Sequence, residues 1–123
     1  MTRAEFLNVD LDLFGGELAE VIAALEPGAF VLHEERDASP AMATLELDGD
    51  PQSLEDAVAG FADLVEKMPA SAPASWDGCE RRVMNVGIQA GDDPHQATFA
   101  LSKDALARLV NMHAELLFTV YPR

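Results

Sequence analysis

Residues 5–14 read EFLNVDLDLF, and this stretch decides the fold. Its apolar and polar residues alternate, with Leu7, Val9, Leu11 and Leu13 on one face and Asn8, Asp10 and Asp12 on the other. An alternation with a period of two is typical of a β-strand that buries one face and exposes the other. The glycine pair at 15–16 ends the pattern, so we expect the chain to begin with a strand whose polar face points to solvent.

The spacing of apolar residues predicts the other elements of the chain. We expect helices from Leu18 to just before Pro27, at 53–68 and at 102–113, and strands at 29–36, 41–47, 81–90, 95–101 and 115–121. The composition of residues 37–40 and 91–94 is that of turns. Residues 69–78 are rich in Pro, Ala and Ser and predict a loop, which Trp76 attaches to the body of the protein.

The order of these elements predicts an α+β fold. The first six follow the βαββαβ pattern of a ferredoxin-like sandwich, with helices on one face of a mostly antiparallel sheet. Residues 95–121 extend this core by a βαβ-type C-terminal unit. If the strand at 95–101 pairs beside 81–90, a right-handed crossover sends the last strand toward an occupied position. The last strand then lies at the far edge, or the strand order differs from the simple one. We expect one domain over residues 1–123.

The net charge of −14 lies entirely in the first half of the chain. Residues 1–66 contain sixteen acids and two bases, whereas residues 67–123 contain six of each. A negative surface steers a basic partner and repels phosphates, so we expect a protein partner and no nucleic acid. No apolar run approaches the roughly 18 residues that cross a bilayer, so we expect no membrane partner. The single cysteine and the excess of arginine over lysine indicate a bacterial cytoplasmic protein.

Alternation along the strands predicts which side chains lie on the sheet face that the helices leave open. The candidate partner-binding face consists of Asn8, Asp10, Asp12, His33, Glu35, Glu46, Asn85, Gln89 and Tyr121. The same alternation adds Met42, Thr44, Gln96, Thr98 and Thr119. Four carboxylates and one histidine then share a face that is otherwise neutral and polar. The alternative is an ordinary solvated sheet surface with no ligand.

Catalytic, cofactor and metal motifs are weak in this sequence, and we expect no cofactor. The three histidines are far apart and lack metal-ligand spacing. His33 and Glu35 share a strand face near Asp10 and Asp12, and oxygen ligands of this kind suit a divalent ion. A metal-assisted hydrolase that uses these four residues is the least favoured alternative. Cys79 is expected to be a passive or partly buried thiol.

Four segments resemble a family of small bacterial proteins: FLNVDLDL at 6–13, WD at 76–77, NVGIQAG at 85–91 and TVY at 119–121. The likeness spans nearly the whole chain and implies one complete domain. It brings no activity and no assigned site residues.

The acidic half of the chain favours a non-enzymatic domain that presents a negative surface to a basic protein. An immunity-type protein that neutralises a basic toxin is a concrete case, because opposite charge speeds capture. The alternative is a small-molecule-sensing homodimer in which Met42, Leu117 and Tyr121 supply apolar contacts between the copies.

Acids on the first two helices predict a second negative surface, made of Glu17, Glu20, Glu26, Glu55, Asp56, Asp63 and Glu66. Both helices are expected on the same side of the sheet, so their outer faces merge opposite the open face. Salt screens the repulsion within such a surface. We therefore expect added salt to raise the melting temperature of the free protein.

Overall fold

A computed structural model describes residues 2–69, 72–93 and 95–123, and these residues form five strands and four helices. The elements are β1 (Glu5–Phe14), α1 (Leu18–Leu25), β2 (Ala29–Glu35), β3 (Met42–Leu47), α2 (Leu54–Glu66), α3 (Ala72–Asp77), β4 (Arg81–Gln89), α4 (Lys103–Asn111) and β5 (Glu115–Tyr121). Met1, Ala70, Ser71 and Pro94 lie outside the described residues, as do the corresponding parts of the predicted loop at 69–78 and turn at 91–94.

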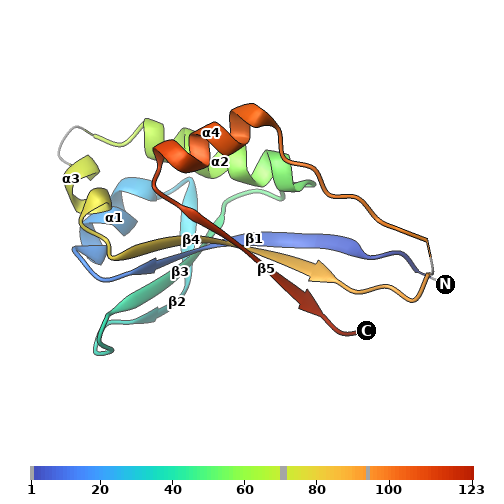
Figure 1. Cartoon of the computed structure of the whole chain (residues 1–123). Coiled ribbons are helices and arrows are strands. Elements are labelled where there is room, and N and C mark those ends of the chain that lie inside the picture. The colour runs from blue at the N-terminus through green and yellow to red at the C-terminus, as the bar shows by residue number, and fades with distance from the viewer. Residues whose placement is uncertain (1, 70–71, 94) are drawn as a thin grey trace.

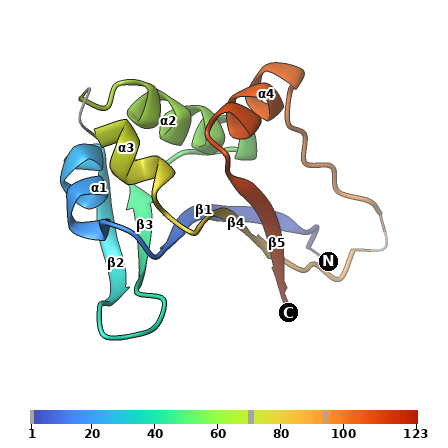
Figure 2. The ribbon, with the colours of Figure 1, turned by 60° about the vertical axis from the view of Figure 1, so that its left-hand side comes forward.

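The strands form one sheet in the order β2-β3-β1-β4-β5, with the helices on one of its faces (Figures 1 and 2). β1 runs antiparallel to both β3 and β4, and β2 runs antiparallel to β3. This is the strand order of a ferredoxin-like core, and it confirms the predicted α+β fold with helices on one face. β5 extends the core and runs parallel to β4.

The predicted strand at 95–101 is wrong. Among the described residues of this segment there is no strand, and Phe99 and Leu101 instead pack against the hydrophobic core. The position beside β4 is therefore free, and β5 occupies it after the α4 crossover. The last strand thus lies next to β4 and not at the opposite edge. Gln96 and Thr98, which were expected on the open face, belong to no strand.

The predicted loop at 69–78 is wrong over residues 72–77, which form the short helix α3. Trp76 is only 3% exposed, and its Nε1–H donates to the carbonyl of Met112 at 3.0 Å. The Arg82 guanidinium donates to the carbonyls of Trp76 and Cys79, both at 2.8 Å. The buried contacts of Trp76 thus stabilise the short helix α3, which the Pro- and Ser-containing sequence of residues 72–77 does not itself favour.

The hydrophobic core lies between the sheet and the helices. Leu11, Leu13 and Leu45 from the strands are fully buried against Phe61 of α2 and Val21 of α1. These side chains occupy alternate strand positions and one helical stripe, as the sequence pattern requires.

Serine caps fix where the two longer helices begin. Ser53 accepts a hydrogen bond from the Asp56 backbone N–H at the start of α2, and Ser102 accepts one from Ala105 at the start of α4, each at 3.1 Å. Side-chain oxygens at these positions satisfy backbone donors that the helix leaves unpaired.

A β-bulge changes the register near the start of β1. Phe6 pairs with Ile88 and Asn8 pairs with Gly87, so the pairing shifts at the residue between them. Phe6 packs against the core, whereas Leu7 is 46% exposed. The prediction that Leu7 faces the core is therefore wrong, because a bulge adds one residue without a partner. From Asn8 onward the predicted alternation holds.

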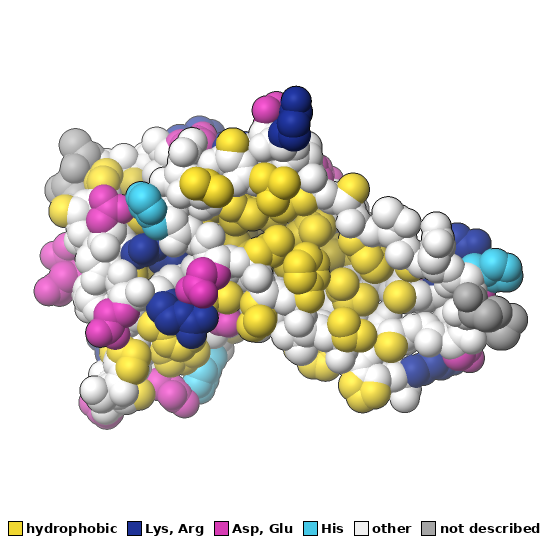
Figure 3. Space-filling model, in the orientation of Figure 1, with side chains coloured by type: hydrophobic (Ala, Val, Ile, Leu, Met, Phe, Trp, Pro, Cys, Tyr) yellow, Lys and Arg dark blue, Asp and Glu magenta, His cyan; other side chains and the backbone are white. Residues whose placement is uncertain are grey.

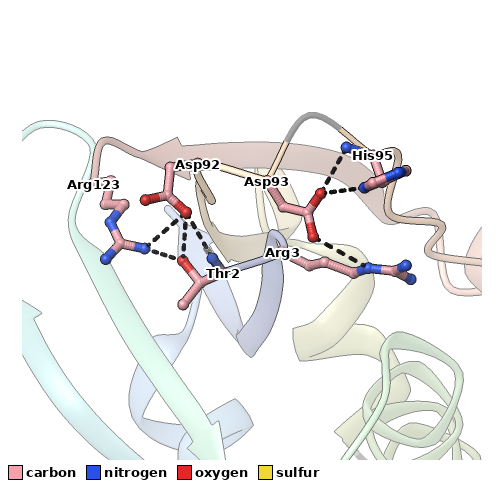
Figure 4. A network of polar contacts seen from close by, with 6 residues as sticks. All are labelled: Thr2, Arg3, Asp92, Asp93, His95 and Arg123. Carbon is pink, nitrogen blue, oxygen red and sulfur yellow. Dashed lines mark hydrogen bonds and ion pairs between the residues drawn. The ribbon is translucent and has the colours of Figure 1, made fainter.

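Two aspartates tie the ends of the described chain together (Figure 4). Asp92 Oδ1 accepts from the Thr2 backbone N–H at 2.6 Å and forms an ion pair with Arg123 at 3.4 Å. Asp93 contacts Arg3 at 3.7 Å and the His95 ring at 2.6 Å. The arginines near both termini are thereby engaged at this end of the sheet. No helix in the described part of the chain is long and apolar enough to cross a membrane.

Candidate functional site

A row of carboxylates crosses the sheet face opposite the helices. Asp10 and Asp12 of β1 point to this face because they alternate with the buried leucines of the strand. Asp10 lies directly opposite Glu46 of β3, and Asp12 lies opposite Thr44. Side chains of directly opposed residues in an antiparallel pair are neighbours, and like charges in such positions repel. The structure thus brings together three of the four carboxylates that the sequence placed on this face.

Hydrogen bonds position the two aspartates of the row but do not neutralise them. The Asn8 amide donates to Asp10 Oδ1 at 3.2 Å, and the Thr44 hydroxyl donates to Asp12 Oδ1 at 2.8 Å. Partial burial of Asp10, and then the charges of Glu46 and Asp12, raise the pKa of its carboxyl from 3.8 to about 6. Near neutral pH the Asp10 carboxyl is still mostly charged, although its desolvation and the repulsion of the neighbouring acids both disfavour that charge.

The arginines of the chain are bound elsewhere. Five of them pair with acids away from the row: Arg3 with Asp93, Arg36 with Glu34, Arg81 with Glu115, Arg108 with Asp63 and Glu66, and Arg123 with Asp92. The sixth, Arg82, donates to backbone carbonyls. Within the described residues, no cation lies within 4.0 Å of the carboxylates of Asp10, Asp12 or Glu46. The row is therefore a site of uncompensated negative charge.

Neutral polar side chains border the row on β4 and β5. Asn85 lies opposite Asp10, and its Oδ1 accepts a hydrogen bond from the Thr119 hydroxyl at 2.8 Å. Gln89 donates to the carbonyl of Pro122 at 3.1 Å, and Tyr121 is 48% exposed. The predicted residues Asn8, Asn85, Gln89 and Tyr121 thus lie on the face with the acids, the first on β1, the next two on β4 and the last on β5.

His33 and Glu35 are on the same face but apart from the row. His33 Nε2 lies 3.1 Å from Glu35 Oε1 on β2, and both side chains are more than half exposed. β3 separates them from β1, because His33 pairs with Thr44. In the part of the chain that the structure describes, no three or more His, Cys, Asp or Glu side chains are grouped so that they could hold a metal ion. The set Asp10, Asp12, His33 and Glu35 is therefore not brought together as a metal-assisted hydrolase requires.

Sequence reasoning missed two aromatic residues of the open face, Phe14 near the Met42 end of the sheet and Phe30 beside Glu46. Phe14 lies on the same face of β1 as Asp12. The Arg81 guanidinium lies 5.5 Å from the centre of the Phe14 ring. Arg81 also forms a two-pronged pair with Glu115, with distances of 2.9 and 3.2 Å. Phe30 of β2 lies opposite Glu46 and is 42% exposed. The alternation of residues 5–14 already placed Phe14 on the open face. Phe30 could not be placed from alternation, because the bulge between Val31 and His33 changes which residues of β2 face the same side.

The acids on α2 differ from those in the row. Arg108 of α4 binds Asp63 at 2.5 Å and Glu66 at 2.7 Å, and its hydrogen bonds lower the pKa of both carboxyls. Glu55 accepts from the Ser102 hydroxyl at 2.6 Å and from its backbone N–H at 2.8 Å. These contacts join α2 to α4. Glu20 of α1 also accepts a hydrogen bond from the Ser75 hydroxyl, so four acids of the predicted helical surface are engaged by other groups of the chain.

Cys79 is 5% exposed, and burial raises the pKa of its thiol despite the nearby Arg82 guanidinium. A buried thiol with a raised pKa is a poor nucleophile. Cys79 is therefore a core residue.

Comparison with known proteins adds no relative: no protein-family model matches the chain, and no curated protein or solved structure does so either. The resemblance carried by residues 6–13, 76–77, 85–91 and 119–121 stays an expectation from the sequence. The functional argument therefore depends on the geometry of the open face.

Proposed function

We propose that this chain is a protein-binding domain whose open sheet face docks a basic protein. The observation that supports it is the uncompensated row of Asp10, Asp12 and Glu46. Charged side chains that crowd one another without a cation lower the stability of the folded protein. A partner that supplies lysine or arginine side chains relieves this repulsion, so part of the binding free energy comes from charges already in place.

The geometry of the row suits arginine. Asp10 and Glu46 are directly opposed on neighbouring strands, and Asp12 is two residues farther along β1 on the same face. A guanidinium group donates two parallel hydrogen bonds to a carboxylate, which gives both orientation and strength. The neutral Asn85 and Thr119 beside the row offer further polar contacts that carry no charge. The negative charge of residues 1–66, which contain β1 and β3, also speeds encounter with a basic partner.

A basic toxin is the concrete partner that we propose. A small acidic domain that covers the cationic substrate-binding surface of a toxin blocks its activity in the manner of an immunity protein. Surfaces that bind nucleic acid are positively charged, so a nuclease toxin has the required complement.

Paired capture experiments with matched net charge test this function. The bait is the full chain, compared with the double reversal Asp10→Lys/Glu46→Lys on the open face. The control is Glu17→Lys/Glu26→Lys, since Glu17 precedes α1 and Glu26 follows it, both on the helix side of the sheet. Each double reversal changes the net charge of −14 by the same amount. A milder pair, Asp10→Asn/Glu46→Gln, covers the case in which lysines destabilise the sheet.

We expect a basic protein to be retained by the wild type and by the control pair, and to be lost with the open-face reversal. The purified partner should then bind with an affinity that falls as salt concentration rises. Equal retention by both reversed variants would contradict the proposal, because binding would then follow net charge and not the open face.

A further inference from the structure

β5 is an edge strand, and it lacks the features that usually prevent an edge strand from pairing with another chain. Within the described chain it pairs on one side alone, with β4, and all seven residues stay in register. The opposite edge strand, β2, has a bulge between Val31 and His33, and residues 33–36 read HEER. Bulges and charges on an edge strand prevent pairing with another chain. The only charge in β5 is Glu115, which is bound to Arg81.

Apolar side chains surround this edge on both faces of the sheet. Leu117 and Tyr121 lie on the open face and are about half exposed. Phe118 and Val120 point to the helix side, because their β4 partners are buried there, yet they are 49% and 59% exposed. Two residues of α4 continue the surface, namely Leu106 and Val110. Figure 3 shows hydrophobic side chains gathered in the middle of the face that α4 and β5 form.

We infer that this surface binds a second copy of the same chain through antiparallel pairing of β5 with β5. A two-fold axis perpendicular to the sheet keeps the helices of both copies on one side, and paired residues must then share a face. An axis through Phe118 pairs the whole strand: Phe118 meets its own copy, and Leu116 meets Val120. On the helix side the contact is thus apolar throughout, and the result is a continuous sheet of two protomers.

The size of the exposed surface fits a dimer contact. Leu106, Val110, Leu117, Phe118, Val120 and Tyr121 expose between 46% and 70% of their surface. With on the order of 150 Å² for each side chain, the lower end of the aromatic range, they leave on the order of 500 Å² of apolar surface in water, divided between the two faces of the sheet at the β5 edge. The largest patch of a typical monomer is about 300–600 Å², and a standard interface covers about 800 Å² per partner. The backbone edge of β5 and its flanking residues supply the difference.

The distribution of charge also favours a second copy. Two chains of net charge −14 repel when their acidic halves meet, but residues 67–123, which contain α4 and β5, are neutral overall. The β5 edge is also the edge farthest from β2 and β3, which hold Glu34, Glu35 and Glu46. Contact through β5 therefore keeps like charges apart. This inference does not depend on the proposed function, and it leaves both open faces on the same side of the dimer.

Oligomeric state in solution, measured by analytical ultracentrifugation, tests the inference. We expect a dimer for the wild type and a monomer for Phe118→Arg, because the axis places two arginines against each other. Leu32→Arg is the matched control, since Leu32 is also 49% exposed but lies on the β2 edge. It should remain dimeric. A wild-type chain that stays monomeric overturns the inference and leaves the edge to a strand of a different protein, and a dimeric Phe118→Arg overturns it as well.

A disulfide experiment covers the case in which Phe118→Arg does not fold. Directly opposed residues in an antiparallel pair have Cα atoms about 4.5–5.5 Å apart, within the range that a disulfide spans. Phe118→Cys should therefore form a covalent dimer on mild oxidation, whereas Leu32→Cys should not. Cys79 is buried and does not interfere. Equal crosslinking of both variants, or none of Phe118→Cys, overturns the inference. Asp10 and Glu46 play no part here, so failure of this contact and failure of basic-partner binding give different results.

Discussion

Replacing Asp10 by Asn should stabilise the free protein at neutral pH. Asn has almost the same shape and keeps an oxygen that can accept the hydrogen bond from Asn8, now at 3.2 Å. It removes the charge that burial, Glu46 and Asp12 disfavour. The substitution therefore separates the electrostatic role of the carboxyl from its packing.

The magnitude follows from the pKa of Asp10. In the folded protein this pKa is about 6, against 3.8 for the unperturbed group. Such a difference corresponds to ~3 kcal/mol of folding free energy before screening. Asp10 is only half-buried, and solvent screening reduces the expected effect to about 1 kcal/mol. Because the folded pKa is raised, the destabilisation is fully present above pH 6 and vanishes as pH falls through 3.8.

Urea unfolding followed by the fluorescence of Trp76, the single tryptophan and a buried one, measures this effect at a series of pH values. We expect Asp10→Asn to exceed the wild type by about 1 kcal/mol at pH 7, with a gain that shrinks as pH falls and vanishes below pH 3.8. Asp37→Asn is the control, because it removes one negative charge from the exposed turn between β2 and β3. A gain that does not depend on pH, or an equal gain for Asp37→Asn, would refute the reasoning about crowded charge.

Three further predictions concern stability. Sodium chloride should raise the Tm of the free protein, because the row of Asp10, Asp12 and Glu46 has no cation partner in the described chain; a flat or falling Tm in calorimetry would speak against it. Arg108→Met should lower the Tm by releasing Asp63 and Glu66, with a loss that shrinks in high salt, and a loss independent of salt would show that packing dominates. Trp76→Phe should lower the free energy of unfolding, measured by circular dichroism, by about 1–2 kcal/mol because the Met112 carbonyl loses its donor, and an unchanged value would contradict a role for that bond.

Much of the fold follows from local pattern. The alternation of residues 5–14 predicted β1 and the orientation of Asp10 and Asp12, because the leucines between them had to be buried. The helical spacing and the serine at 53 predicted α2 within two residues at each end. These features depend on interactions between near neighbours along the chain, which the sequence records directly.

Other parts of the fold depend on contacts between distant residues. Residues 95–101 alternate as a strand does, but Phe99 and Leu101 pack on the core while β5 takes the edge of β4. The helix at 72–77 is held by the bond from Trp76 to Met112, thirty-six positions away. No local sequence pattern predicts the packing of residues 95–101 or the helix at 72–77.

The sequence predicted which residues lie on the open face, but not which of them are neighbours or whether a cation lies beside them. Alternation placed Asp10, Asp12 and Glu46 on one face, but only strand order shows that β1 and β3 are neighbours and that His33 is a strand farther away. The absence of a cation beside the row, within the described residues, depends on where the arginines are bound. Those pairs join positions far apart in the sequence, such as Arg108 and Asp63.

The most direct test of the docking face is the pKa of the Asp10 carboxyl, measured by NMR in the free protein and in complex with its captured partner. We predict about 6 in the free protein and a value at or below the ordinary 3.8 in the complex, where a cation of the partner replaces the repulsion of Glu46 and Asp12. A free value near 3.8, or a value that stays near 6 in the complex, would contradict the proposal that this row binds a basic protein.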